Sequence, residues 1–251
     1  MLQAVIHQKS SRWLKEMNRE ISSTTNTPRE RIPREDEITS TVFGMLQYFD
    51  SREVYAFFCK LIKKDMETDI HDISHLFSFW ESKTHKWKQI ANKDKKTEPD
   101  VMVRFTLNKT EKITFILELK WGQNSHFGQD QLERQWANFQ EGETHLIYLA
   151  THIHHDFLFK KDQHNHTNWH DLTWGQFLGF VLQQSYDTTS YSQGYTLFLY
   201  DLAGFLQQLN LRQFSRFSHF NFPTKWNENQ TLLQLNKFSF PLFTLTWKHR
   251  E

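Results

Sequence analysis

The chain has 251 residues, a length typical of one large domain or of one domain with additions. Its 30 Lys and Arg residues nearly balance its 29 Asp and Glu residues, so a nucleic-acid-binding surface would have to be a local basic patch. The single cysteine, Cys59, excludes an internal disulfide and a cysteine-based zinc cluster, and its apolar neighbours favour a buried, unreactive thiol.

No apolar stretch approaches the roughly 20 residues that a membrane-spanning helix needs. The first residues, MLQAVIHQ, also lack the long apolar core of a secretory signal peptide. We therefore expect a soluble cytoplasmic protein with no membrane partner.

The N-terminal third predicts helices. Residues 1–20 predict an appended helix for dimerisation or partner contact, and the Ser-, Thr- and Pro-rich residues 21–33 predict a linker. Residues 35–49 carry apolar side chains at helical spacing after an acidic start, which suits the positive end of a helix dipole. Residues 51–64 continue as a second helix.

Two ambiguous segments follow, residues 73–80 and residues 85–90, and one of them should supply the first strand of a core sheet. The alternation in Lys86–Ile90 favours the second segment. The basic loop NKDKK comes next and leads directly to Pro99 and Asp100. Its lysines, Lys93, Lys95 and Lys96, are candidates either for phosphate contacts or for a solvated turn.

Residues 101–106 and 113–120 alternate in polarity with a polar turn between them, which predicts a β-hairpin. Side chains two apart on a strand share a face, so Glu118 and Lys120 point to the same side. The hairpin would also bring Asp100, at the start of its first strand, beside Glu118. We therefore expect two carboxylates and one ammonium group at one end of a sheet.

This combination of charges favours metal chemistry. Two close carboxylates repel each other unless a cation or a proton lies between them. Mg²⁺ suits one or two carboxylates together with water and phosphate oxygens, and it stabilises charge on an attacked phosphate. A neighbouring lysine can orient the nucleophile or neutralise the phosphate.

The pair Pro99-Asp100 followed by Glu118-Leu119-Lys120 resembles the PD-(D/E)xK nuclease superfamily, over about half of the chain. The resemblance implies an α/β fold of the restriction-endonuclease-like type, in which a central mixed sheet of α-β-β-β-α-β order is flanked by helices. It also implies that Asp100, Glu118 and the Leu119 carbonyl bind Mg²⁺ or Mn²⁺, and that Lys120 positions or activates the attacking water.

Two supporting residues follow from the same resemblance. A glutamate on the first core helix often joins the metal site in this superfamily, and Glu35 fits that position better than Glu37. A glutamine on the helix after the motif often lies near the scissile phosphate. In the predicted helix 129–139 this is Gln131, with Gln135 one turn later as the alternative.

The remaining elements complete the prediction. Residues 145–150 predict the last core strand, and residues 172–186 and 195–209 predict helices, the first capped by Asp171 or Thr173. The His-rich residues 151–170 predict an exposed loop and not a zinc site, because no Cys and no helical HxxxH spacing accompanies them and the stretch is polar. The aromatic tail, residues 212–251, predicts core or hairpin strands, although its aromatic side chains could also stack on bases.

The sequence thus predicts an N-terminal helix and linker (1–33), a nuclease core (34–170) and a C-terminal helical and aromatic-rich extension packed on the core (171–251). The predicted function is metal-dependent phosphodiester hydrolysis, with DNA as the favoured substrate and a homodimer as the form suited to cutting both strands. The alternative is an inactive protein of nuclease-like fold that binds nucleic acid or a protein partner. The intact set of Asp100, Glu118 and Lys120 favours the enzyme.

Overall fold

The computed structural model describes residues 35–67, 69–85, 95–121, 130–163, 166–187, 191–209 and 211. The predicted N-terminal helix (1–20) and linker, the segment Lys86–Ile90, Lys93 and the aromatic tail (212–251) lie outside these residues.

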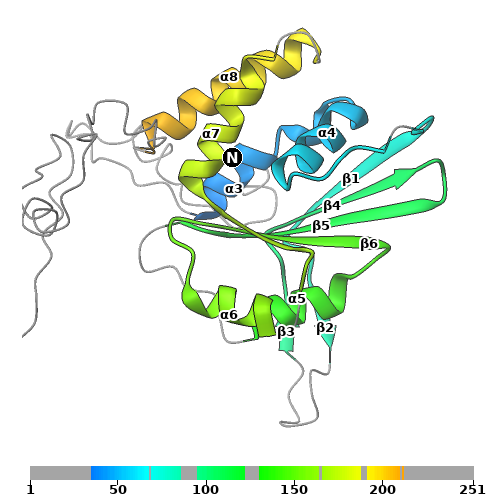
Figure 1. Cartoon of the computed structure of the whole chain (residues 1–251), viewed down its shortest axis with the longest axis vertical. Helices are drawn as coiled ribbons and strands as arrows, with labels where there is room; N and C mark the ends of the chain where they lie inside the picture. Colours follow the sequence, from blue (N-terminus) through cyan, green and yellow to red (C-terminus); the bar gives the residue numbers. More distant parts are fainter. Residues whose placement is uncertain are drawn as a thin grey trace, which may run out of the picture. The chain divides into compact units, whose positions relative to one another are not determined.

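The described chain is a mixed α/β structure with a five-stranded sheet flanked by helices (Figure 1), which confirms the predicted fold class at this level. None of the described helices is long and apolar enough to cross a membrane. The elements in chain order are α3 (Glu35–Phe43), the 3₁₀ helix η1 (Leu46–Tyr48), α4 (Ser51–Leu61), β1 (Ile73–Phe79), β2 (Lys83–His85), β3 (Lys95–Thr97), β4 (Val101–Leu107), β5 (Glu111–Lys120), α5 (Gln131–Phe139), β6 (Glu143–Ala150), α6 (His155–Gln163), β7 (Trp169–Thr173), α7 (Trp174–Ser185) and α8 (Gln193–Gln208).

The main sheet has the strand order β1-β4-β5-β6-β7. β1, β4 and β5 are antiparallel neighbours, whereas β5, β6 and β7 run parallel. The predicted hairpin is confirmed as β4 and β5, with Val101 opposite Leu117. β2 and β3 form a separate two-stranded sheet just before Asp100.

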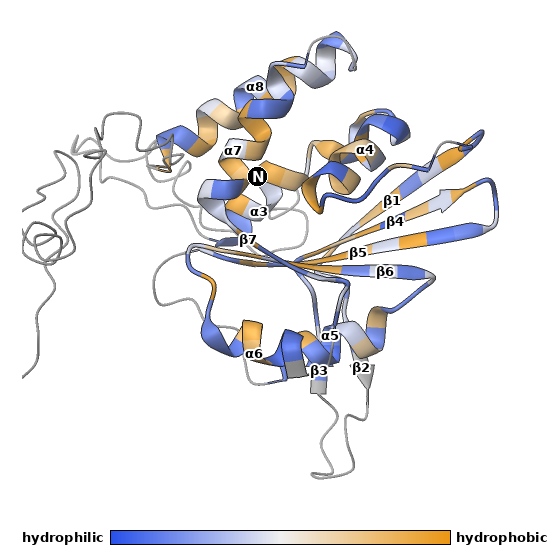
Figure 2. Cartoon of the chain, viewed as in Figure 1, coloured by the Kyte–Doolittle hydropathy of each residue, from blue (hydrophilic) through white to orange (hydrophobic). Residues whose placement is uncertain are grey.

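Helices cover both faces of the main sheet (Figure 1). α3, α4, α7 and α8 pack on one face and form the main core with alternate residues of β4 and β5, including Phe105 and Phe115. The rings of Phe58 on α4 and Phe115 on β5 lie 5.1 Å apart. α5 and α6 cover the other face, where Leu132 and Phe157 pack against β6 and β7. β5 is consequently buried on both sides over most of its length, and the hydrophilic turn before it lies at the edge of the molecule (Figure 2).

Two of the predicted helices have well-defined starts. Asp50 caps α4 by accepting a hydrogen bond from the backbone N–H of Arg52. Thr173, one of the two candidates, caps α7 in a reciprocal arrangement with Gln176. These caps satisfy backbone donors that the first turn of a helix leaves without intrahelical partners.

Several predictions of secondary structure were wrong. The first core strand is β1, at residues 73–79, because β1 pairs with β4, whereas the sequence favoured Lys86–Ile90, which lies outside the described residues. The helix predicted over 35–49 ends at Phe43 and is followed by η1. The predicted loop 151–170 contains α6 and the start of β7, so β6 is not the last strand of the sheet.

The turn before β6 generates a prediction about stability. Gly142 has a φ of +65°, and a Cβ placed there would overlap the backbone carbonyl of Lys112. We expect Gly142→Ala to destabilise the protein by at least about 1–3 kcal/mol, the usual cost of a strained backbone. Gly204 lies inside α8, and a Cβ added to it would meet open space, so Gly204→Ala should stabilise the protein by about 0.5–1 kcal/mol. Urea unfolding of both variants measures the difference, and equal effects would contradict the described turn.

Candidate active site

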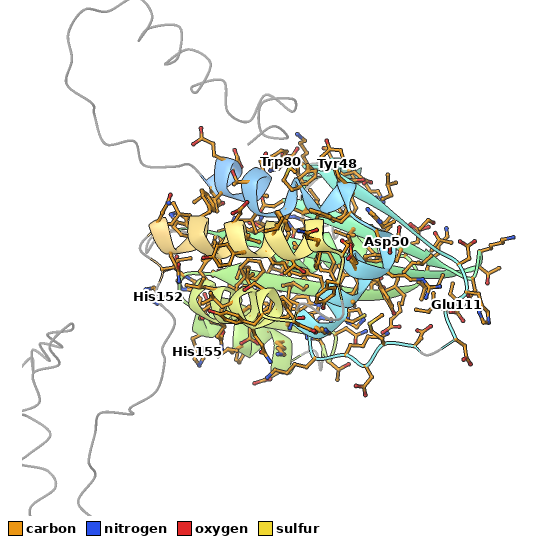
Figure 3. The ribbon with its side chains drawn as sticks, turned by 90° about the horizontal axis from the view of Figure 1, so that it is seen from above. Tyr48, Asp50, Trp80, Glu111, His152 and His155 are labelled. Carbon is orange, nitrogen blue, oxygen red and sulfur yellow. The ribbon has the colours of Figure 1, made fainter. Side chains whose placement is uncertain are left out.

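The charged residues of the predicted hairpin gather at the end of the sheet where β5 and β6 finish. In Figure 3, Glu111 marks the end at which β5 begins, and His152, just after β6, marks the opposite end. The backbone N–H of Thr151 donates to the carbonyl of Lys120 over 3.2 Å, so the two parallel strands end side by side. Side chains that follow strand ends at one edge of a sheet can converge on a shared ligand.

Asp100 is placed by the strand pairs on both sides of it. Its backbone carbonyl accepts from the N–H of Trp80, at the end of β1, over 3.2 Å. Its carboxylate Oδ2 accepts from the N–H of Leu119 on β5 over 2.7 Å. The side chain is buried, and Oδ1 has no hydrogen-bond partner among the described residues. Asp100 therefore lies across the hairpin from Glu118, as the spacing predicted.

Glu118 is almost fully buried between β5 and α5, and its carboxylate is held by three donors. Gln131 Nε2 donates to Oε1 over 2.6 Å, and Gln135 Nε2 donates to Oε2 over 2.5 Å. Lys120 Nζ lies 2.6 Å from Oε1. Both candidate glutamines therefore contact the same carboxylate, since they lie one turn apart on the face of α5 that packs on the sheet.

Lys120 links the motif to the first core helix. Its Nζ lies 3.2 Å from Oε1 of Glu35 and donates to the carbonyl of Leu119 over 3.0 Å. The other oxygen of Glu35 accepts from the backbone N–H of Trp121 over 2.7 Å. Glu35, the preferred of the two acidic candidates on α3, thus reaches the site and orients Lys120.

Burial and mutual repulsion dominate the electrostatics. Burial, together with the nearby charge of Glu118, raises the pKa of Asp100 well above its ordinary value. Burial also raises the pKa of Glu118, although Lys120 and Gln135 oppose the shift. Burial alone would lower the pKa of Lys120, but the three surrounding carboxylates outweigh it and raise that pKa. Lys120 is therefore a permanent ammonium at neutral pH.

The donor set fits a hard divalent cation. Asp100 Oδ1, Glu118 Oε2 and the Leu119 carbonyl are oxygen ligands of the kind that Mg²⁺ and Mn²⁺ accept, and Mg²⁺ needs no more than one or two carboxylates from a protein. A cation would also relieve the repulsion that raises the pKa of Asp100. Within the described ranges no group of three or more His, Cys, Asp and Glu side chains is arranged to hold a metal, so a cation here would be held by the two carboxylates with the carbonyl or water as further ligands.

Two of the histidines and one of the lysines singled out in the sequence have partners outside this site. Among the histidines of residues 151–170, His166 stacks on Trp169 and His170 lies against His145 on β6. Lys96, on β3, forms an ion pair with Glu98 over 2.7 Å and is 65% exposed. It is therefore a solvated residue near Asp100.

Tyr148 was not predicted as part of the site. It pairs in register with Glu118 on the neighbouring parallel strand, so the two side chains share a face. Burial is the main cause that raises the pKa of Tyr148 to about 12, and Lys120, Glu118 and Glu35 also influence it. Trp174 was also missed, and its indole N–H donates to the carbonyl of Lys120 over 3.0 Å. The apolar run HLIYLA predicted a strand, but a run without polar–apolar alternation could not assign Tyr148 to the face of Glu118.

Comparisons of the chain with protein-family models, with curated proteins and with solved structures found no match in any of the three. The functional argument therefore rests on the geometry and electrostatics of the site.

The raised pKa of Asp100 generates a prediction about pH. Between the ordinary pKa of an aspartate, about 3.9, and the raised value, the folded protein binds more protons than the unfolded chain, so stability falls as pH rises through this interval. Asp100→Asn removes this loss and keeps an acceptor for the Leu119 N–H. In EDTA we expect the variant to melt above wild type at pH 8 and the difference to shrink towards pH 4.

The same melting experiment has a metal arm. Mg²⁺ should raise the melting temperature of the wild type and leave Asp100→Asn unchanged, because a ligand stabilises only the protein that binds it. Identical melting curves for the two proteins at every pH would contradict the burial argument.

Proposed function

We propose that the protein is a metal-dependent nuclease that hydrolyses phosphodiester bonds, with DNA as the substrate that the superfamily resemblance favours. The observation that carries the proposal is the convergence of Asp100, Glu118 and Lys120 at one strand end, where one lysine faces two buried carboxylates. Asp100 and Glu118 would hold Mg²⁺ or Mn²⁺ together with the Leu119 carbonyl.

The topology supports the proposal. α3, β1, β4, β5, α5 and β6 occur in the α-β-β-β-α-β order that the resemblance implies, with η1 and α4 inserted before β1 and the small β2–β3 sheet inserted before β4. Asp100 precedes the second strand of this order, and Glu118 and Lys120 end the third. The motif thus has the structural context that a short sequence pattern requires.

The residues of the chain have distinct tasks in the proposed reaction. When bound, the cation would supply charge for the attacked phosphate and lower the pKa of a water. Lys120, which lies beside Glu118 and Glu35, would position or activate the attacking water or neutralise phosphate charge. Glu35 holds Lys120 in place, and the bonds from Trp174 and Thr151 to the Lys120 carbonyl fix its backbone.

A cleavage assay tests the proposal. Supercoiled plasmid, linear duplex, single-stranded DNA and RNA are incubated with Mg²⁺, Mn²⁺ or EDTA. We expect metal-dependent cutting and a loss of at least about 10²–10³-fold in Lys120→Ala, the usual effect of removing one group that stabilises developing charge. Lys112, exposed at the other end of β5 and paired with Glu141, provides the matched control, and Lys112→Ala should cut like wild type.

The outcomes separate the candidate functions. Equal cutting by wild type and Lys120→Ala would contradict the proposed site. Binding of nucleic acid without cutting under any metal condition would instead favour the alternative, an inactive protein that retains a nuclease-like fold.

A further inference from the structure

The two amides of α5 do not contribute equally to Glu118. Each carboxylate oxygen offers two lone-pair positions. Oε1 of Glu118 already accepts a hydrogen bond from Gln131 Nε2 and pairs with the Lys120 ammonium. Among the described residues, the donor to Oε2 is Gln135 Nε2. One lone pair therefore remains for a cation, and it belongs to the oxygen that Gln135 holds.

Gln135 combines a short hydrogen bond to Glu118 with a buried amide oxygen that lacks a donor among the described residues. Its side chain is completely buried, and its Oε1 has no hydrogen-bond partner among the described residues. A buried amide oxygen without a donor costs stability that an apolar side chain of the same size would avoid. The opposite assignment of the amide would place its oxygen against the carboxylate, so the donation to Glu118 is the one that electrostatics favours.

We propose that Gln135 is a positioning residue that aims Oε2 of Glu118 at the divalent cation, and that Gln131 has a smaller part in metal binding because Lys120 shares its oxygen. The inference rests on the proposed function, since it concerns the metal of that site. It assigns Gln135 to the shell of residues around the metal ligands, where a hydrogen bond fixes the orientation of a ligand.

Metal affinity, and not cleavage alone, is the property that this arrangement controls. Gln135 lies on the buried face of α5. Its amide contacts the proposed metal ligand, Glu118, from the side of this helix. Its removal should therefore weaken metal binding while the reaction at saturating metal stays close to that of wild type. If Gln135 had a purely structural role, its replacement would lower thermal stability, but it would not weaken metal binding while the rate at saturating metal stayed unchanged.

The test measures Mn²⁺ binding to the metal-free full-length protein from the electron paramagnetic resonance signal of free Mn²⁺. Gln135→Met keeps the volume of the side chain and removes the donor. We expect its Mn²⁺ dissociation constant to rise by about 10- to 100-fold, the usual effect of losing such a partner. Gln131→Met should change the constant by only a few fold.

Asn138→Ala is the matched control, because Asn138 lies on the same helix and donates to Thr97 without touching Glu118. It should bind Mn²⁺ like wild type. Cleavage titrated with Mn²⁺ supplies the second measurement, and in Gln135→Met the metal concentration for half-maximal rate should rise while the maximal rate is largely kept. If Gln135→Met does not fold, Gln135→Asn replaces it, since its shorter amide cannot reach Glu118.

The outcomes distinguish this inference from the proposed function. Wild-type protein that binds no Mn²⁺ and cuts no nucleic acid overturns both. Wild-type protein that binds Mn²⁺ and cuts, beside a Gln135 variant that binds Mn²⁺ equally tightly, overturns the inference alone. A Gln131→Met protein that loses as much affinity as the Gln135 variant overturns the difference between the two amides.

Discussion

The burial of two like charges at the end of one hairpin is the constraint on which the surrounding structure depends. Asp100 and Glu118 are both removed from water, and neither could be ionised there without compensation. The compensation comes from four directions: the Leu119 N–H, the ammonium of Lys120, and the amides of Gln131 and Gln135. Two of these groups belong to β5 of the central sheet, and the two amides belong to α5, which covers it.

The two buried carboxylates also affect the protonation state of Lys120. A buried lysine with no acidic neighbours would tend to lose its proton, and it could then serve as a base. Here the surrounding carboxylates, including Glu35 from a helix distant in sequence, keep the ammonium charged. The contact between Lys120 and Glu35 comes from a helix distant in sequence, so the spacing of the motif alone does not contain it.

Local patterns predicted the central part of the molecule. The alternation in β4 and β5 gave the hairpin, and the two-residue spacing gave the shared face of Glu118 and Lys120. Pairing between distant segments was not predictable in this way, so the sequence could not decide which segment would pair with β4. α6 was missed because its FLF run does not alternate at helical spacing, with Phe157 buried and Phe159 exposed. The sequence also left Gln131 and Gln135 as alternatives, whereas the structure uses both.

The main core has a consequence for synthesis of the protein. Its helical layer combines α3 and α4, which are translated early, with α7 and α8, which come after every strand of the sheet. During translation the apolar face of β4 and β5 can therefore be only partly covered until Leu206 has left the ribosome. A growing chain with such an exposed face is open to aggregation and is a suitable client for chaperones. The order of the helices along the chain thus delays completion of the core until α8 has been synthesised.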